Sequence, residues 1–237
     1  MRRPSLFAIA FTLALAACNK VDSENILSSG IYGSISARAA GAGSTTVSAT
    51  LFLESPLTLD FIELGADDEL VATQGATAKT MTETDVLNVV SYHATFPTEA
   101  EGTLFEVAFL RTVDAGAPSS TVALPAPLTL TVLPAPTVSR AAALTVQWSA
   151  SAAGDSMSWS AAGDCIDSAS GGIAGDPGTL TLPANTLVKR MGTMVADSCP
   201  VALTVTRRRD GQLDPGYGKG GTIVGEQTRQ ATFTSQP

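Results

Sequence analysis

Apolar and polar residues alternate with a period of two along much of this chain. In residues 46–53, Val47, Ala49, Leu51 and Leu53 fall on one side of the alternation. Further short runs repeat it: Leu57, Leu59 and Phe61; Tyr92, Ala94 and Phe96; Phe105, Val107 and Phe109; Leu144, Val146 and Trp148; and Val201, Leu203 and Val205. This period is typical of half-buried antiparallel strands, and Gly, Asp and Pro residues between the runs supply turns. The sequence therefore predicts an all-β protein.

A proline-rich segment divides the chain. Residues 124–127 (Leu-Pro-Ala-Pro) recur nine positions later as residues 133–136. Because proline has no N–H to donate to a β-ladder, each copy stops the extension of a sheet. We place a domain boundary at the second copy. The prediction is two antiparallel β-sandwich domains, an acidic one over residues 31–132 and a second one over residues 133–237.

The start of the second domain carries a resemblance to a known class of module. Residues 133–139 (Leu-Pro-Ala-Pro-Thr-Val-Ser), with Trp148 beyond them, resemble the opening of a fibronectin type III or related immunoglobulin-like module. Trp148 and Trp159 both precede Cys165 and Cys199, however, so the Cys–Trp–Cys order of true immunoglobulin domains is absent. The resemblance implies a sandwich and does not single out a family.

The first eighteen residues have the organisation of an export signal. Arg2 and Arg3 form a basic start, and residues 6–15 are almost entirely apolar. That apolar run is about half the length of a membrane-spanning helix. Residues 15–18 (Leu-Ala-Ala-Cys) then resemble the lipobox of bacterial lipoproteins. The resemblance implies that a signal peptide, residues 1–17, is removed.

The lipobox resemblance also implies an anchor and a location. Cys18 would carry acyl chains such as palmitate, and residues 18–30 would form a polar tether to the membrane. Lipoproteins retained in the inner membrane usually have Asp after the Cys, whereas this chain has Asn19. The resemblance therefore implies the outer membrane, facing either the periplasm or the outside. An ordinary secretory signal, or twin-arginine export through Arg2 and Arg3, are the alternatives.

Charge excludes one class of partner. Without residues 1–17 the chain has twelve basic and twenty-two acidic residues, a net charge near −10. Such a surface repels nucleic acid, so no nucleic-acid partner is expected. Residues 31–132 carry twelve acidic and three basic side chains, whereas residues 133–237 carry eight of each. The acidic half could meet a basic partner or divalent cations, although solvated acidic faces are common.

The three cysteines are expected to have two different roles. If the lipid occupies Cys18, Cys165 and Cys199 remain, and in an oxidising compartment they should form a disulfide. A metal pair or a reactive thiol would be the alternatives, but neither has supporting ligands nearby in the sequence.

One short motif is a candidate for catalysis. Residues 154–156 (Gly-Asp-Ser) are similar to the nucleophile motif of GDS-type esterases, which would make Ser156 the nucleophile of a hydrolase. In that family a histidine close to the C-terminus activates the serine. The one histidine here, His93, lies upstream in the other half and alternates onto a polar strand face. Ser156 would therefore lack a base, and a turn explains the motif better.

Two other clusters are candidates for binding. Asp67, Asp68 and Glu69 lie at a predicted turn and could gather calcium, although the alternating spacing of an EF-hand is absent and a polar turn is the simpler interpretation.

The second candidate is an irregular loop over residues 214–221. Its Tyr217 and Lys219, together with the preceding Arg207, Arg208 and Arg209, form the expected ligand loop. A long hairpin connection, with the arginines balancing the acidic half across a domain interface, is the alternative.

These observations favour a lipid-anchored envelope protein without enzymatic activity or a cofactor, which acts as a binding or structural module on an envelope protein or a glycan. The alternative function is a carbohydrate-binding surface module, which would need an exposed aromatic platform. A hydrolase using Ser156 ranks third.

Overall fold

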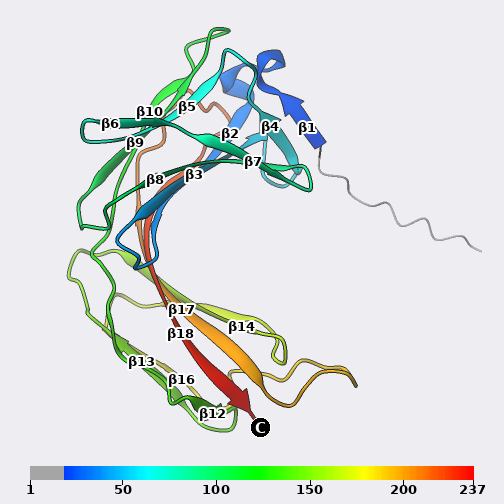
Figure 1. Cartoon of the computed structure of the whole chain (residues 1–237), viewed down its shortest axis with the longest axis vertical. Coiled ribbons are helices and arrows are strands. Elements are labelled where there is room, and N and C mark those ends of the chain that lie inside the picture. The colour runs from blue at the N-terminus through cyan, green and yellow to red at the C-terminus, as the bar shows by residue number, and fades with distance from the viewer. Residues whose placement is uncertain (1–18) are drawn as a thin grey trace, which may run out of the picture.

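The computed structural model describes residues 19–237, and in that part the chain is all-β. It has eighteen strands and two short 3-10 helices, η1 (Ser23–Asn25) and η2 (Ser28–Gly30). Figure 1 shows an elongated, curved molecule with β1 to β10 at one end, β13 and β16 at the other, and β17 and β18 running between them. No helix within residues 19–237 is long and apolar enough to cross a membrane. The predicted signal peptide and Cys18 lie outside the described residues.

One long sheet of eleven strands connects the two ends of the molecule. Its main path is, in spatial order, β1 (Asn19–Asp22), β4 (Asp60–Glu63), β3 (Thr45–Leu53), β2 (Ile31–Ala39), β18 (Gly221–Gln236), β17 (Cys199–Asp210), β14 (Ser156–Gly163) and β15 (Ala169–Ile173). Three strands join from the side: β8 (Val89–Phe96) pairs with β3, β7 (Thr82–Val86) pairs with β8, and β12 (Thr137–Ser139) pairs with β18.

Two smaller sheets cover this long sheet. In what we call the first half, the covering sheet has the order β10 (Ala117–Ala123), β9 (Leu104–Leu110), β5 (Glu69–Gln74) and β6 (Thr77–Thr80). In the second half it has the order β11 (Leu130–Val132), β13 (Leu144–Trp148) and β16 (Thr179–Leu182). Each small sheet shares one hydrophobic core with the long sheet. The molecule therefore consists of two β-sandwich halves.

The period-two pattern explains both cores. In the first half, Val47, Ala49 and Leu51 of β3 are fully buried, and the rings of Phe96 and Phe105 meet edge to face at 5.4 Å. In the second half, the buried alternating residues are Leu144, Val146, Trp148, Val201, Leu203 and Val205. The faces predicted from these runs are thus confirmed.

The hairpin of β17 and β18 belongs to both halves. The two strands stay in antiparallel register from Cys199 opposite Ser235 to Asp210 opposite Val224. Ile223, near the start of β18, lies in the first core, whereas Phe233, near its end, lies in the second. Sixteen residues of extended chain span roughly 54 Å. A single strand is therefore long enough to be built into both cores.

This shared hairpin corrects the predicted domain boundaries. Leu124 belongs to the first core and Leu128 to the second, so the crossing between the halves occurs before residue 133. Tyr217 and Ile223 then return the chain to the first core. The simple division into residues 31–132 and 133–237 is wrong. The period-two alternation identifies strands, but it does not show which sheet each strand joins.

The prediction of purely antiparallel sheets is also wrong. β1 pairs with β4, β12 with β18, and β18 with β2 in parallel. The last of these pairings needs close approach of two backbones. Gly221 begins β18 at φ +142°, and a Cβ there would lie 1.9 Å from the carbonyl oxygen of Gly33. Glycine is therefore required where β18 meets β2.

The predicted tether is part of the fold. β1 starts at Asn19, and Ser23 and Ser28 are buried. Ser28 donates its backbone N–H and its hydroxyl to the Asp114 carboxylate, at 2.6 and 2.8 Å. The guanidinium of Arg111 donates to the backbone carbonyls of Ser23 and Ile26. The sequence predicts a polar tether here, but Ser23, Ile26 and Ser28 are held by Arg111 and Asp114, which are distant in sequence.

One predicted run departs from its pattern. Of Leu57, Leu59 and Phe61, only Phe61 is buried, and it lies in β4. Leu57 is 90 % exposed, and Leu59 has a left-handed backbone with φ +57°. Pro56 breaks the strand, and the chain turns before it resumes pairing at Asp60.

The shared hairpin predicts that the halves unfold together. Leu70 is buried in β5, which belongs only to the first half, and Leu70→Ala should cost about 2–5 kcal/mol. Both tryptophans, Trp148 and Trp159, lie in the second half. Urea unfolding followed by tryptophan fluorescence should therefore shift to lower denaturant in the Leu70→Ala variant, although the reporters are in the other half.

The matched control is Leu104→Ala, which changes an exposed leucine of the same half. It should leave the urea midpoint unchanged within experimental error. A fluorescence midpoint that stays unchanged in Leu70→Ala, while circular dichroism shows an early separate transition, would mean that the halves are independent.

Candidate functional site

Arg207 in β17 is the most deeply buried charged residue of the expected ligand loop. Its guanidinium donates to the Asp176 carboxylate from Nε and Nη2, at 3.0 and 2.6 Å. It also donates to the carbonyl oxygens of Ala126, Pro127 and Ser149, at 2.7, 3.1 and 2.7 Å. An arginine has five N–H donors, and these five contacts use them all. Arg207 therefore binds the segment of residues 124–127, where the chain crosses from the first half to the second. It has no N–H group left to donate to a ligand.

The partner of Arg207 was not identified from the sequence. Asp176 accepts the indole N–H of Trp148 at 2.7 Å and the backbone N–H of Ser151 at 2.9 Å. Burial of this carboxyl opposes its ionisation, but the hydrogen bonds from Trp148, Ser151 and Arg207 and the guanidinium charge outweigh burial. Together they lower the pKa of Asp176 below its ordinary value.

A sequence signal for Arg207 did exist. Arg207 has the same parity as the buried Leu203 and Val205, so the alternation already pointed its side chain inward. Asp176 lies in a turn before β16 with no such pattern around it. Its role follows only from the fold.

Arg209 lies on the same side of β17 as Arg207. Its guanidinium binds both carboxylate oxygens of Asp155, at 2.7 and 3.0 Å, and donates to the carbonyl oxygen of Leu124 at 3.2 Å. Arg208 points the other way and pairs with Asp210 on the exposed face. Of the arginine run, two members thus fasten residues 124–127 to β17.

Tyr217 and Lys219 are separated from the arginines. Tyr217 is 2 % exposed and stacks on Phe109 of the first core, with ring centroids 6.1 Å apart. Its hydroxyl has no hydrogen-bond partner in the described structure, and burial raises its pKa. Lys219 pairs with Glu54 at 3.4 Å on the surface. Tyr217 and Lys219 therefore have other partners than Arg207, Arg208 and Arg209, and the five side chains do not form one surface.

The acidic turn of Asp67, Asp68 and Glu69 does not have the arrangement expected of a calcium site. Asp68 is buried and accepts from Arg111 Nε at 3.0 Å, whereas Asp67 and Glu69 are exposed. Asp68 is thus paired with a guanidinium inside the fold, while its two acidic neighbours face solvent. Within residues 19–237 no three acidic, histidine or cysteine side chains are placed to hold a metal.

Ser156 and His93 lie in different halves. The Ser156 hydroxyl, at the start of β14, donates to the carbonyl oxygen of Arg208 at 3.2 Å. His93 of β8 lies between the hydroxyls of Ser48 and Ser91, each 2.9 Å from a ring nitrogen. The two side chains are therefore not arranged as a nucleophile and its base.

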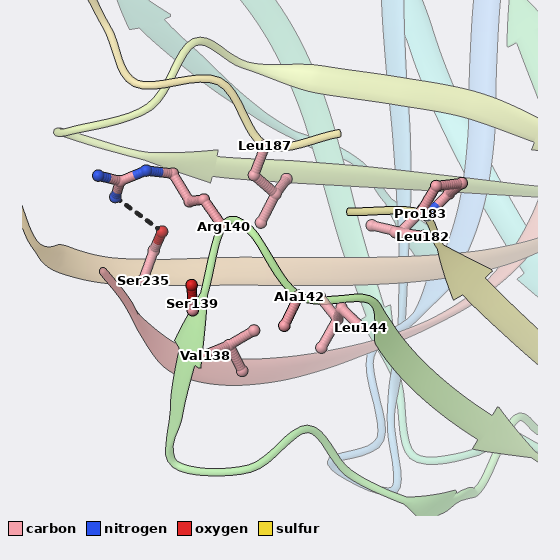
Figure 2. A pocket seen from close by; sticks show the side chains of 9 residues that line it. All are labelled: Val138, Ser139, Arg140, Ala142, Leu144, Leu182, Pro183, Leu187 and Ser235. Carbon is pink, nitrogen blue, oxygen red and sulfur yellow. Dashed lines mark hydrogen bonds between the residues drawn. The ribbon is translucent and has the colours of Figure 1, made fainter. Parts of the chain in front are cut away.

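Hollows in the surface are small or open. Figure 2 shows one at the end of the second half, lined by Val138, Leu144, Leu187 and Arg140. The Arg140 guanidinium extends to the Ser235 hydroxyl and donates to it at 3.2 Å. The volume of this hollow, about 10 Å³, accommodates roughly one water molecule. A hollow of about 430 Å³ beside Gln74 and Leu104 is open to solvent. Neither resembles the enclosed apolar cleft typical of small-molecule sites.

Cys165 and Cys199 form the disulfide that the sequence predicts, with Cα atoms 5.6 Å apart. The bond closes a loop that contains β15, β16 and the exposed Met191 and Met194. It fastens this loop to the first residue of β17.

Comparisons with known proteins give little beyond this description. No family model and no curated protein matches the chain. A cytokine receptor complex is 16 % identical over 85 % of this chain and 94 % of that chain, with a TM-score of 0.29. The FN1–FN3 domains of chicken CNTN1 are 9 % identical over 86 % and 64 %, with a TM-score of 0.26. Fibronectin(III)-like modules of Clostridium thermocellum CbhA are 13 % identical over 86 % and 94 %, with a TM-score of 0.24.

Structural similarity at such low TM-scores says nothing about function. The class of protein follows from the molecule itself: an all-β chain of two β-sandwich halves, whose buried charges hold the halves together.

The buried ion pair generates a stability prediction. Asp176→Asn leaves the Arg207 charge without its partner, and this should cost about 3–5 kcal/mol in urea unfolding at pH 7. Because the pKa of Asp176 is lowered in the folded state, its contribution is fully present above the unfolded pKa. It should be lost as pH falls below about 4. The difference between native chain and variant should therefore shrink in acid.

The control is Asp210→Asn, which removes the carboxylate of the exposed Arg208–Asp210 pair on the same strand and should leave the urea midpoint nearly unchanged. An Asp176→Asn variant that is as stable as the native chain at pH 7 would show that the Asp176–Arg207 pair does not stabilise the junction between the halves.

The disulfide generates a second prediction. Replacing Cys165 and Cys199 by Ala opens a loop with a sequence separation of 34 and should cost about 4 kcal/mol in the chain-entropy model. Urea unfolding of this variant should match that of the native chain treated with reductant. Equal stability of reduced and oxidised native protein would contradict the expectation.

Proposed function

We propose that this chain is an exported lipoprotein, anchored by acyl chains on Cys18, whose two β-sandwich halves form a rigid binding or structural module at the outer membrane. The proposal assigns no enzymatic step and no cofactor. Its partner would be an envelope protein or a glycan.

The observation that carries the proposal is the lipobox resemblance of residues 15–18. β1 (Asn19–Asp22) is the first strand that the structure describes, and it pairs with β4 along its whole length. An acyl chain on Cys18 would be attached directly to a folded strand, so the body would stand close to the membrane.

The disulfide supports the same compartment. Disulfides persist in oxidising surroundings and are rare in a reducing cytosol. The pair Cys165–Cys199 is fully formed in the fold and fastens the second half. A chain that relies on this bond is suited to the periplasm or the cell surface.

The carbohydrate-binding alternative has less support. Trp148, Tyr92 and Tyr217 are buried, and Trp159 and Tyr32 are only partly exposed. Carbohydrate platforms need flat aromatic faces open to solvent. The described aromatic residues favour packing instead.

The test is fractionation of cells that produce the native chain or Cys18→Ala. The native chain should incorporate labelled palmitate and sediment with the outer membrane, whereas the variant should be released in soluble form. Protease shaving of intact cells then separates a surface location, in which the native chain is digested, from a periplasmic one, in which it is protected. A variant that stays membrane-bound like the native chain would overturn the lipoprotein proposal.

A further inference from the structure

Five exposed apolar side chains occur in two loops of the first half. Leu57 and Leu59 lie between β3 and β4, and Val86, Leu87 and Val89 lie at the turn of the β7–β8 hairpin. Leu57 and Leu87 are 90 % and 89 % exposed. We call these five residues the apical patch. Side chains this apolar and this exposed, gathered in adjoining loops, are typical of a surface that meets a partner or a membrane.

Both loops of the apical patch lie against β1. The backbone N–H of Asn19 donates to the carbonyl oxygen of Leu59 at 3.3 Å. Lys20 donates to Asp85 at 2.9 Å, and Asp85 is the residue before Val86. Figure 1 shows the β7–β8 turn, the start of β4 and the start of β1 at the same corner of the molecule. The two loops of the apical patch therefore flank β1, the strand that follows Cys18.

Backbone conformation adds an independent observation. Leu59 and Leu87 both have left-handed φ values, +57° and +54°. This region is costly for a bulky side chain, and two-residue hairpin turns favour Asn or Gly there. A solvated loop gains nothing from leucine at such positions. Strained residues that persist are a pointer to function, here one that uses the apolar side chains.

Charge around β1 does not oppose contact with lipid headgroups. Lys20 pairs with Glu63 at 2.7 Å as well as with Asp85, and Asn19 donates to the Asp60 carboxylate at 3.0 Å. The hydrogen bonds from Lys20 to Glu63 and Asp85 raise its pKa, so the ammonium stays charged. The carboxylates nearest to β1 are thus engaged within the protein.

We propose that the apical patch rests in the headgroup region of the membrane that holds Cys18, and so fixes the orientation of the body. This inference rests on the proposed lipidation. The Cα atoms of Cys18 and Asn19 are about 3.8 Å apart, so an acyl anchor enters the bilayer next to the patch. The occupant that fits is a zwitterionic lipid surface, because apolar loops insert there while the acidic body would be repelled by anionic lipid.

The test uses the lipoprotein extracted with its own anchor. Acylation consumes Cys18 and the disulfide consumes the other two cysteines, so a Thr84→Cys variant offers one free thiol, on β7 near the turn. A fluorophore on this thiol is followed after reconstitution into phosphatidylcholine–phosphatidylethanolamine vesicles containing lipids with a headgroup-level quencher. A parallel Leu104→Cys variant places the fluorophore on the exposed face of β9 as the matched control.

We expect quenching at position 84 to exceed that at position 104 several-fold. It should fall to the level of position 104 when Leu57→Ser and Leu87→Ser are added, whereas an added Leu110→Ser, at another exposed leucine, should leave it unchanged. Equal quenching at both positions, or quenching that survives the double serine change, overturns the inference.

Mass spectrometry of the extracted chain separates the two proposals. An acylated Cys18 with an unquenched position 84 leaves the proposed function standing and removes the apical contact. A Cys18 without acyl chains overturns the proposed function, and the inference falls with it.

Discussion

The antiparallel ladder between β17 and β18 is the interaction on which the rest of this structure depends. Its residues run in register from Cys199 and Ser235 to Asp210 and Val224. On one side β17 supports β14, and on the other β18 supports β2 in the first half and β12 in the second. Neither core can be completed without it, because Ile223 and Phe233 of the same strand close different cores.

A shared hairpin leaves one weak point, the crossing of residues 124–127. Two prolines there prevent a regular ladder, so the carbonyl groups of the crossing need other partners. Arg207 and Arg209 provide them, and Asp176 and Asp155 neutralise the two guanidinium groups. Gln227 of β18 donates from its side-chain amide to the carbonyl oxygen of Pro125 at 3.4 Å. The junction is therefore held by buried charge and hydrogen bonds, where the two hydrophobic cores meet but do not merge.

Local pattern predicted the strands well and their assembly poorly. The alternation at Val47, Ala49 and Leu51 identified a buried face because every second side chain of a strand points the same way. The pairing of β18 with β2 joins Glu226 to Arg38, 188 residues away, and no local pattern specifies it.

The candidate site shows the same limit. Arginines were expected to face a ligand because they are charged, yet Arg207 is buried by partners that only the fold supplies. The disulfide was predictable, since Cys165 and Cys199 had few alternatives. The apolar character of Leu57 and Leu87 was visible in the sequence, but their exposure depends on turns with left-handed backbone.

The position of β18 in the sequence has a consequence for biogenesis. This strand follows all the others, so a chain that emerges in order from a ribosome or a translocation channel has no complete core until β18 is out. Most multidomain chains fold their first domain while the next is still being made. Here the core of the first half lacks one of its strands until β18 has been made, so we expect both cores to close together.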